Sequence, residues 1–209
     1  MFSKLQYISQ GKTSEEQLKN IQEALAAGCD WIQLRFKNSE VKQLIELARE
    51  VKILCALHNA TFILNDNVEI AKEINADGVH LGLTDMQISD ARKILGNKII
   101  GGTANTIEDV LTRIEEKCDY IGLGPFRFTT TKEKLSPVLG IEGYKKIMRK
   151  LYEKEISLPV FAIGGIVPEN VPAILETGIY GIAVSGVITN HENKKELISQ
   201  LNKYFYEYA

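Results

Sequence analysis

The chain has 209 residues, of which 44% are hydrophobic, and its 25 basic and 27 acidic side chains give a formal net charge of −2. This length suggests one domain, and the balanced charge argues against a general nucleic-acid binder, which carries a basic excess or stripe. The N-terminus lacks the apolar core of a signal peptide, and no apolar stretch approaches the ~20 residues of a membrane helix. We therefore expect a cytoplasmic protein without membrane contact.

The three cysteines, Cys29, Cys55 and Cys118, are odd in number and widely spaced. Their spacing matches no metal site, and each lies near apolar residues. We expect them to be reduced thiols in the core, which agrees with a cytoplasmic location.

Short apolar runs and amphipathic segments alternate along the whole chain. The expected strands are 5–9, 31–35, 61–64, 78–82, 98–102, 120–124, 159–165 and 180–186. The expected helices are 14–28, 39–57, 67–75, 86–95, 106–117, 141–154, 168–177 and 192–206. Ser14 is the predicted N-cap of the first helix, and Pro168 is expected to open the seventh.

Eight strand–helix units in one chain predict a parallel sheet closed into a single (β/α)8 TIM barrel over residues 1–209. The alternative is an open, doubly wound sheet of the dinucleotide-binding kind. Such a fold would carry a G-x-G-x-x-G turn after its first strand, and this chain has none there. No linker or low-complexity tract divides the sequence.

Polar residues follow nearly every expected strand, and in a barrel these positions share one rim. Gln33, Arg35 and Lys37 are spaced by two, so we expect them to point to one side. The other candidates are Asn65, Asp66, His80, Asp85, Thr103, Asn105, the Thr/Lys loop at 129–132, Gly164, Gly165, Ser185 and Gly186.

Each of these residues also has an ordinary structural interpretation. Arg35 and Lys37 could pair with helix residues, and Asp66 and Asp85 could cap the helices that follow them. His80, inside an apolar strand, could be a satisfied core histidine. The two glycines could form only a tight turn, and the threonine run could be a solvated loop.

The combination favours a binding site for anions and a hard cation. Basic residues come from the second and sixth strands, and two aspartates come from the third and fourth. Backbone N–H groups at Gly164–Gly165 and Ser185–Gly186 precede the last two helices, where barrels commonly bind phosphate. Mg²⁺ usually takes one or two carboxylates together with phosphate oxygens. One substrate with a diphosphate and another with a monophosphate would use all of these groups.

The chain resembles the thiamine-phosphate synthase (thiamine-phosphate pyrophosphorylase) family over nearly its whole length. The resemblance rests on the order and spacing of several short segments rather than on any one of them. These are IQLRFK (32–37), ILND (63–66), DGVHLG with Asp85, IIGGTANT (99–106), YIGLGPFRFTTTK (120–132), AIGGI (162–166) and GIAVSGVI (181–188).

That resemblance implies a Mg²⁺-dependent transferase of thiamine biosynthesis, which joins hydroxymethylpyrimidine diphosphate to thiazole phosphate and releases pyrophosphate. Asp66 and Asp85 would hold Mg²⁺ on the diphosphate, and Arg35, Lys37 and Lys132 would bind it and stabilise the leaving group. Gln33 and Asn65 would bind the pyrimidine, and Thr103 would lie near the reacting centre. On the thiazole phosphate side the family implies Thr129, Thr131, Gly164, Gly165, Val184 and Ser185.

The family mechanism is dissociative, so the protein need not supply a nucleophile. The loop from Gly124 to Val138 would act as a lid that brings hydroxyls and a cation to the substrates and excludes water. The sequence departs from the family pattern at Asn67, Leu83, Thr103 and Asn105, and Asn105 stands where a histidine is usual.

Three alternative functions stay open. A related thiazole tautomerase would use a histidine where this chain has Asn105. A silent relative would only bind a phosphate ligand. An unrelated barrel isomerase of amino-acid biosynthesis would use Asp66 and Asp85 as an acid/base pair. A Mg²⁺ requirement separates the synthase from all three. We expect small-molecule substrates and a homo-oligomer, whose size the sequence does not give.

Overall fold

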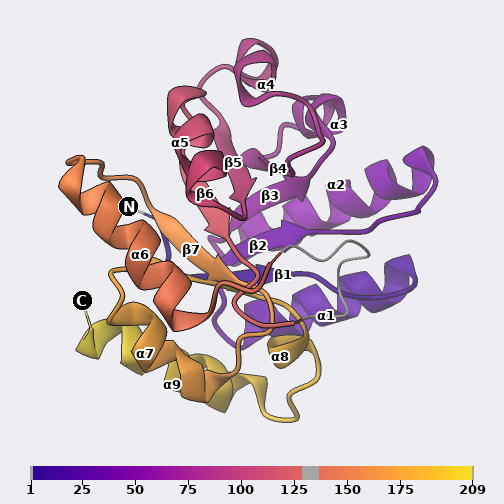
Figure 1. Ribbon diagram of the computed structural model, residues 1–209. Helices are drawn as coiled ribbons and strands as arrows, with labels where there is room; N and C mark the ends of the chain where they lie inside the picture. The colour runs from indigo at the N-terminus through magenta and orange to yellow at the C-terminus, as the bar shows by residue number, and fades with distance from the viewer. Residues whose placement is uncertain (1, 129–136, 209) are drawn as a thin grey trace.

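The computed structural model describes residues 2–128 and 137–208, and its centre is a closed barrel of eight parallel strands in chain order (Figure 1). The strands are β1 (Leu5–Ile8), β2 (Trp31–Leu34), β3 (Thr61–Asn65), β4 (Gly78–Leu81), β5 (Ile99–Ala104), β6 (Tyr120–Leu123), β7 (Val160–Ile163) and β8 (Gly181–Val184). Pairing of β1 with β8 closes the barrel. The predicted barrel is confirmed and the doubly wound alternative is wrong; the extent of a single domain over 1–209 stays a prediction.

Helices surround the barrel, and those from α1 to α7 connect successive strands (Figure 1). They are α1 (Ser14–Ala26), α2 (Val41–Leu57), α3 (Val68–Glu73), α4 (Ile88–Leu95), α5 (Ile107–Glu115), α6 (Gly140–Glu153), α7 (Val171–Leu175), α8 (Gly186–Thr189) and α9 (Lys194–Glu207). The short helix α8, directly after β8, was not expected from the sequence.

The predicted N-cap of the first helix and the predicted start of the seventh are wrong. The N-cap of α1 is Thr13, whose hydroxyl accepts a hydrogen bond from the backbone N–H of Glu16, and Ser14 is the first helical residue. Pro168 opens a 3₁₀ turn, Pro168–Asn170, and the α-helix begins only at Val171. Proline has no N–H to donate and suits either kind of first turn, so its position alone does not distinguish them.

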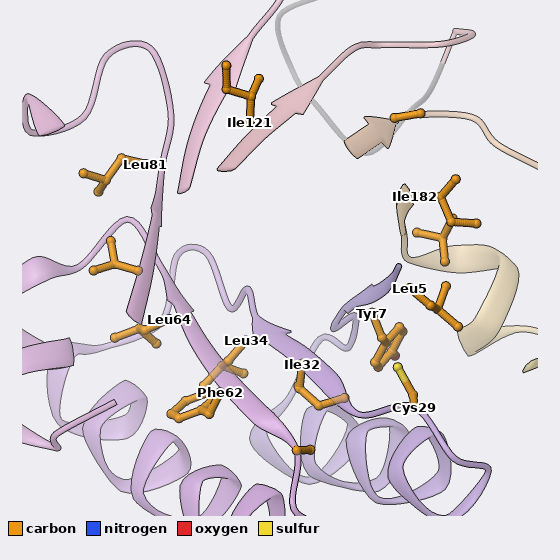
Figure 2. Close-up of a cluster of buried hydrophobic side chains, with 14 of the residues drawn as sticks. Leu5, Tyr7, Cys29, Ile32, Leu34, Phe62, Leu64, Leu81, Ile121 and Ile182 are labelled. Carbon is orange, nitrogen blue, oxygen red and sulfur yellow. The ribbon is translucent and has the colours of Figure 1, made fainter. Parts of the chain in front are cut away.

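Alternation along the strands divides the buried residues into two layers. Side chains that face the helices form the larger apolar layer, and Figure 2 shows part of it, with Ile32, Leu34, Phe62 and Leu64 from adjacent strands. Side chains that face inward form a smaller cluster, which consists of Ile8, Trp31, Ile63, Tyr120, Phe161 and Ala183. Because successive side chains of a strand point to opposite faces, β1, β2, β3, β6, β7 and β8 contribute to both layers.

All three cysteines are free and buried, as predicted. Burial raises the pKa of each thiol, Cys29, Cys55 and Cys118, to about 12, so the thiols stay protonated. In the part of the chain that the structure describes, no helix has the length and apolar character to cross a membrane.

Candidate active site

A cavity of about 230 Å³ lies at the carboxyl ends of the strands. Most of the site residues predicted from the sequence meet there. Those that line the cavity are Gln33, Arg35, Asn65, Thr103, Gly164, Gly165, Val184 and Ser185. The sequence did not identify the apolar part of the wall, which comes from residues such as Ile8, Ile163 and Ala183.

Gln33 and Asn65 form the polar wall contributed by β2 and β3. The side-chain amide of Gln33 donates a hydrogen bond of 2.8 Å to Asn65 Oδ1. Gln33 is 2% exposed, and its Oε1 has no hydrogen-bond partner within residues 2–128 and 137–208. A buried acceptor that lacks a partner costs free energy, which a ligand that donates a hydrogen bond would recover.

Arg35 lies where this cavity meets a second one of about 460 Å³, which Lys37 also lines. The backbone at Arg35 is fixed from two sides. Its N–H donates to Ser9 Oγ at 3.0 Å, and its carbonyl accepts from Gln17 Nε2 at 3.1 Å. Two buried polar side chains therefore position the guanidinium at the mouth of the site.

Lys37 does not line the main cavity, although its spacing from Gln33 and Arg35 predicted a common side. The strand ends at Leu34, so the alternation stops before Lys37. Its Nζ lies 3.3 Å from Asp66 Oδ2, and both residues line an adjacent cavity of about 270 Å³. The ion-pair interpretation is thus correct for Lys37, but its partner is one of the predicted metal ligands rather than a helix residue.

Asp66 and Asp85 lie in contact, as a shared metal site requires. Burial, followed by a hydrogen bond and the like charge of Asp85, raises the pKa of Asp66 to about 6, while Lys37 acts in the opposite direction. Asp85 Oδ2 also accepts from the backbone N–H of Gly82 at 2.6 Å. No cluster of three or more His, Cys, Asp or Glu side chains suited to a metal occurs in the described ranges.

Neither aspartate caps a helix, so that alternative is wrong for both. Helix α4 begins at Ile88 after its N-cap Gln87, two residues beyond Asp85. Helix α3 has Asn67 as its N-cap. Neither carboxylate is therefore used as a helix N-cap.

Thr103 lies within β5 and is held by a histidine that the sequence left in doubt. Its hydroxyl is 3.0 Å from His80 Nε2, and His80 Nδ1 is 3.1 Å from the Tyr120 hydroxyl. His80 is buried, as the core interpretation expected, but it also lines the cavity. Tyr120 was missed because it begins a strand that looks purely apolar.

The Gly164–Gly165 turn requires glycine at both positions. The φ angles are 92° and 68°, in the left-handed region that side chains rarely adopt. A Cβ on Gly164 would lie 2.8 Å from Pro125 Cβ, and one on Gly165 would lie 2.9 Å from the Phe128 carbonyl oxygen. The turn thus lets the segment after β6 approach the strand ends closely.

Thr129, Thr131 and Lys132 lie outside the described residues. The chain before them leaves the barrel beside the glycine turn, because the N–H of Arg127 donates to the Gly164 carbonyl at 3.0 Å. Asn105, at the position where the family usually has histidine, donates from Nδ2 to the Gly124 carbonyl at the end of β6.

Comparison with known proteins identifies the family of this chain. The family model described as thiamine monophosphate synthase matches residues 5–188. The chain belongs to this family. A thiamine-phosphate synthase of Flavobacterium psychrophilum is 63% identical over 97% of this chain and 99% of its own length. Another, from Bacteroides fragilis, is 51% identical over 88% of this chain and 91% of its own length.

A solved structure supports the same assignment. Thiamine phosphate pyrophosphorylase from Pyrococcus furiosus superposes with a TM-score of 0.86 at 33% identity, over 98% of this chain and 96% of that one. The thiamine-phosphate synthase assignment predicted from the sequence is therefore confirmed.

Proposed function

We propose that this member of the thiamine-phosphate synthase family is a Mg²⁺-dependent transferase that joins hydroxymethylpyrimidine diphosphate to thiazole phosphate and releases pyrophosphate. The observation that carries the proposal is the contact between Asp66 and Asp85 beside Lys37, next to the Arg35 end of a polar cavity. Carboxylates and cations placed side by side suit a metal-bound diphosphate better than either charge alone.

The described residues fit Mg²⁺. Burial raises the pKa of Asp66 most, and the hydrogen bond and like charge of Asp85 raise it further. A divalent cation held by Asp66 and Asp85 would remove the repulsion between their like charges and use the oxygen ligands that Mg²⁺ prefers. When bound, the metal would neutralise charge on the leaving pyrophosphate.

The pyrimidine would occupy the cavity beside Gln33 and Asn65. Gln33 Oε1, which has no hydrogen-bond partner among the described residues, can accept a hydrogen bond from the amino group of an aminopyrimidine. Gln33 is itself oriented by its hydrogen bond to Asn65. Thr103, across the cavity, offers a hydroxyl to the same substrate.

The chemistry then requires positioning and charge stabilisation rather than a protein nucleophile. The C–O bond to the diphosphate breaks, and its electron pair leaves with pyrophosphate. The thiazole nitrogen donates its lone pair to the resulting pyrimidine cation and forms the new C–N bond. Arg35 and Lys37, with Lys132 from the loop, would stabilise the leaving group.

The thiazole phosphate would bind where the ends of β7 and β8 line the cavity, at Gly164, Gly165, Val184 and Ser185. Barrels commonly bind phosphate at this position. Thr129 and Thr131 would complete that site. A cytoplasmic location, homo-oligomerisation and the absence of nucleic-acid binding stay predictions from the sequence.

The test is pyrophosphate release by the purified chain, with each substrate omitted in turn and with Mg²⁺ replaced by EDTA. Release that needs both substrates and the metal supports the synthase. Conversion of the thiazole phosphate alone, without Mg²⁺, would instead indicate the tautomerase. Binding of phosphate ligands with no turnover, by a chain shown to be folded, would indicate the silent relative.

A further inference from the structure

A buried polar chain crosses the interior of the barrel from β1 to the active-site cavity. Gln6 Nε2 lies 3.2 Å from the Tyr120 hydroxyl, which lies 3.1 Å from His80 Nδ1. His80 Nε2 in turn lies 3.0 Å from Thr103 Oγ1. His80, Thr103 and Tyr120 come from the neighbouring strands β4, β5 and β6, and barrel closure brings Gln6 of β1 to them.

Two inward-facing glycines make the space for this chain. A Cβ on Gly101 would lie 2.2 Å from the Tyr120 ring, and one on Gly122 would lie 3.1 Å from the His80 ring. Gly101 pairs in register with Tyr120, and Gly122 pairs with Thr103. The barrel wall therefore omits side chains at the two positions where the tyrosine and histidine rings lie.

The donors and acceptors define the direction in which the hydrogen bonds of this polar chain run. An amide nitrogen can only donate, so Gln6 Nε2 donates to the Tyr120 hydroxyl oxygen. Tyr120 is fully buried, and burial raises its pKa above the ordinary range, so the phenol keeps its proton. Within the described part of the chain its hydroxyl has two hydrogen-bond partners, Gln6 and His80.

The proton of Tyr120 is therefore directed to His80 Nδ1, because Gln6 Nε2 cannot accept it. A neutral imidazole that accepts at Nδ1 carries its own proton on Nε2 and donates it to Thr103 Oγ1. We propose that Gln6, Tyr120 and His80 are positioning residues that turn the Thr103 hydroxyl into a hydrogen-bond donor toward the bound pyrimidine diphosphate. This rests on the proposed function for the identity of that substrate.

Hydrogen bonds that run in the opposite direction, from Thr103 through His80 to Tyr120, would give Thr103 a different role. If Tyr120 accepted from His80 Nδ1–H, then His80 Nε2 would accept the Thr103 proton, and Thr103 could offer the substrate only an oxygen lone pair. The tautomer of His80 distinguishes the two arrangements, and it can be measured without substrate. The protein has three histidines, so a His58→Gln, His191→Gln variant leaves His80 as the only histidine.

The first test is ¹⁵N NMR of the His80 ring in that variant at neutral pH. We expect the proton on Nε2 and an unprotonated Nδ1. Tyr120→Phe should reduce the Nε2–H population, whereas Tyr144→Phe should not. Tyr144 is the matched control because its buried hydroxyl donates to the Leu123 carbonyl and takes no part in the hydrogen bonds between Gln6 and Thr103. A proton on Nδ1, or a tautomer that Tyr120→Phe leaves unchanged, would overturn the proposal.

The second test is a double-mutant cycle on pyrophosphate release. Thr103→Val should lower kcat about tenfold, Tyr120→Phe about fivefold, and Thr103→Ser should restore most of the loss. In the Thr103→Val background, Tyr120→Phe should have almost no further effect, because both act through one hydroxyl. Effects that simply multiply would contradict the proposal. Failure of the chain to release pyrophosphate would contradict the proposed function and leave the tautomer measurement as a separate test.

Discussion

The two ends of the barrel differ sharply in chemistry. At the amino end the interior is filled by aromatic rings: Trp31 stacks on Phe2 with ring centroids 5.1 Å apart and meets the Phe161 ring edge-on at 5.0 Å. At the carboxyl end the interior opens into a cavity lined by groups such as Gln33 and Arg35. One end is built for packing and the other for binding, so mutations at the two ends should separate stability from catalysis.

The largest expected effect lies at the amino end. Phe161→Ala removes a fully buried ring that contacts Trp31, Tyr120 and Tyr180. We expect the free energy of unfolding to fall by about 3–5 kcal/mol, measured by urea denaturation. The exposed control Tyr152→Ala should change it by about 0.5 kcal/mol or less.

This variant also tests the separation itself. Phe161→Ala that remains folded at low temperature should keep a kcat within about twofold of the parent, because Phe161 does not line the cavity. A large loss of kcat in the folded variant would show that the two ends are coupled, and would contradict the separation of stability from catalysis.

The next effect lies at the carboxylate pair. Asp85→Asn keeps an oxygen that can accept from Gly82 but loses the charge that a metal needs. We expect pyrophosphate release to fall about 100-fold or more, with little change in stability. Asp90→Asn is a matched control, since Asp90 pairs only with Lys93 on the surface of α4 within the described residues. Full activity of Asp85→Asn would remove Asp85 from the metal site.

A smaller effect is expected at Arg35. Arg35→Lys keeps the positive charge but loses the planar guanidinium that can bind two phosphate oxygens. We expect KM for the pyrimidine diphosphate to rise about tenfold while the thiazole phosphate KM stays the same. Equal increases for both substrates would instead indicate a general charge effect.

The smallest expected effect is on the pH dependence of stability. Because the folded-state pKa of Asp66 is raised to about 6, the folded protein binds more protons than the unfolded chain between about pH 4 and 6. The contribution of Asp66 to stability is therefore present at low pH and lost as pH rises through this window. Thermal denaturation should show this slope, and Asp66→Asn should flatten it. If the slope persists in the variant, the pH dependence of stability comes from other titratable groups.

The sequence predicted the barrel because local patterns determine it. Eight repeats of apolar strand and amphipathic helix appear in order, and each strand can be recognised without knowing its neighbours. Most of the cavity was predicted for a related reason, since strand ends in a barrel share one rim. The N-cap was misplaced because Thr13 and Ser14 are adjacent hydroxyl residues that suit the position equally well.

The polar chain inside the barrel could not be predicted in this way. Gln6 and Tyr120 are 114 residues apart in sequence, and each lies in a segment that looks like an ordinary buried strand. Only the closed register places them together. The partner of Lys37 in its ion pair, Asp66, was also missed, because the strand ends before Lys37 and the direction of its side chain no longer follows from alternation.

The central claim is that the carboxylate pair and Arg35 form one metal–diphosphate site at the carboxyl end. Calorimetric titration of the folded chain with pyrimidine diphosphate, in Mg²⁺ and in EDTA, tests it most directly. We predict binding in Mg²⁺ that weakens at least about tenfold in EDTA, and a Mg²⁺ dependence that disappears in the Asp66→Asn, Asp85→Asn variant. Equal affinity with and without the metal, in a chain shown to be folded, would contradict the account.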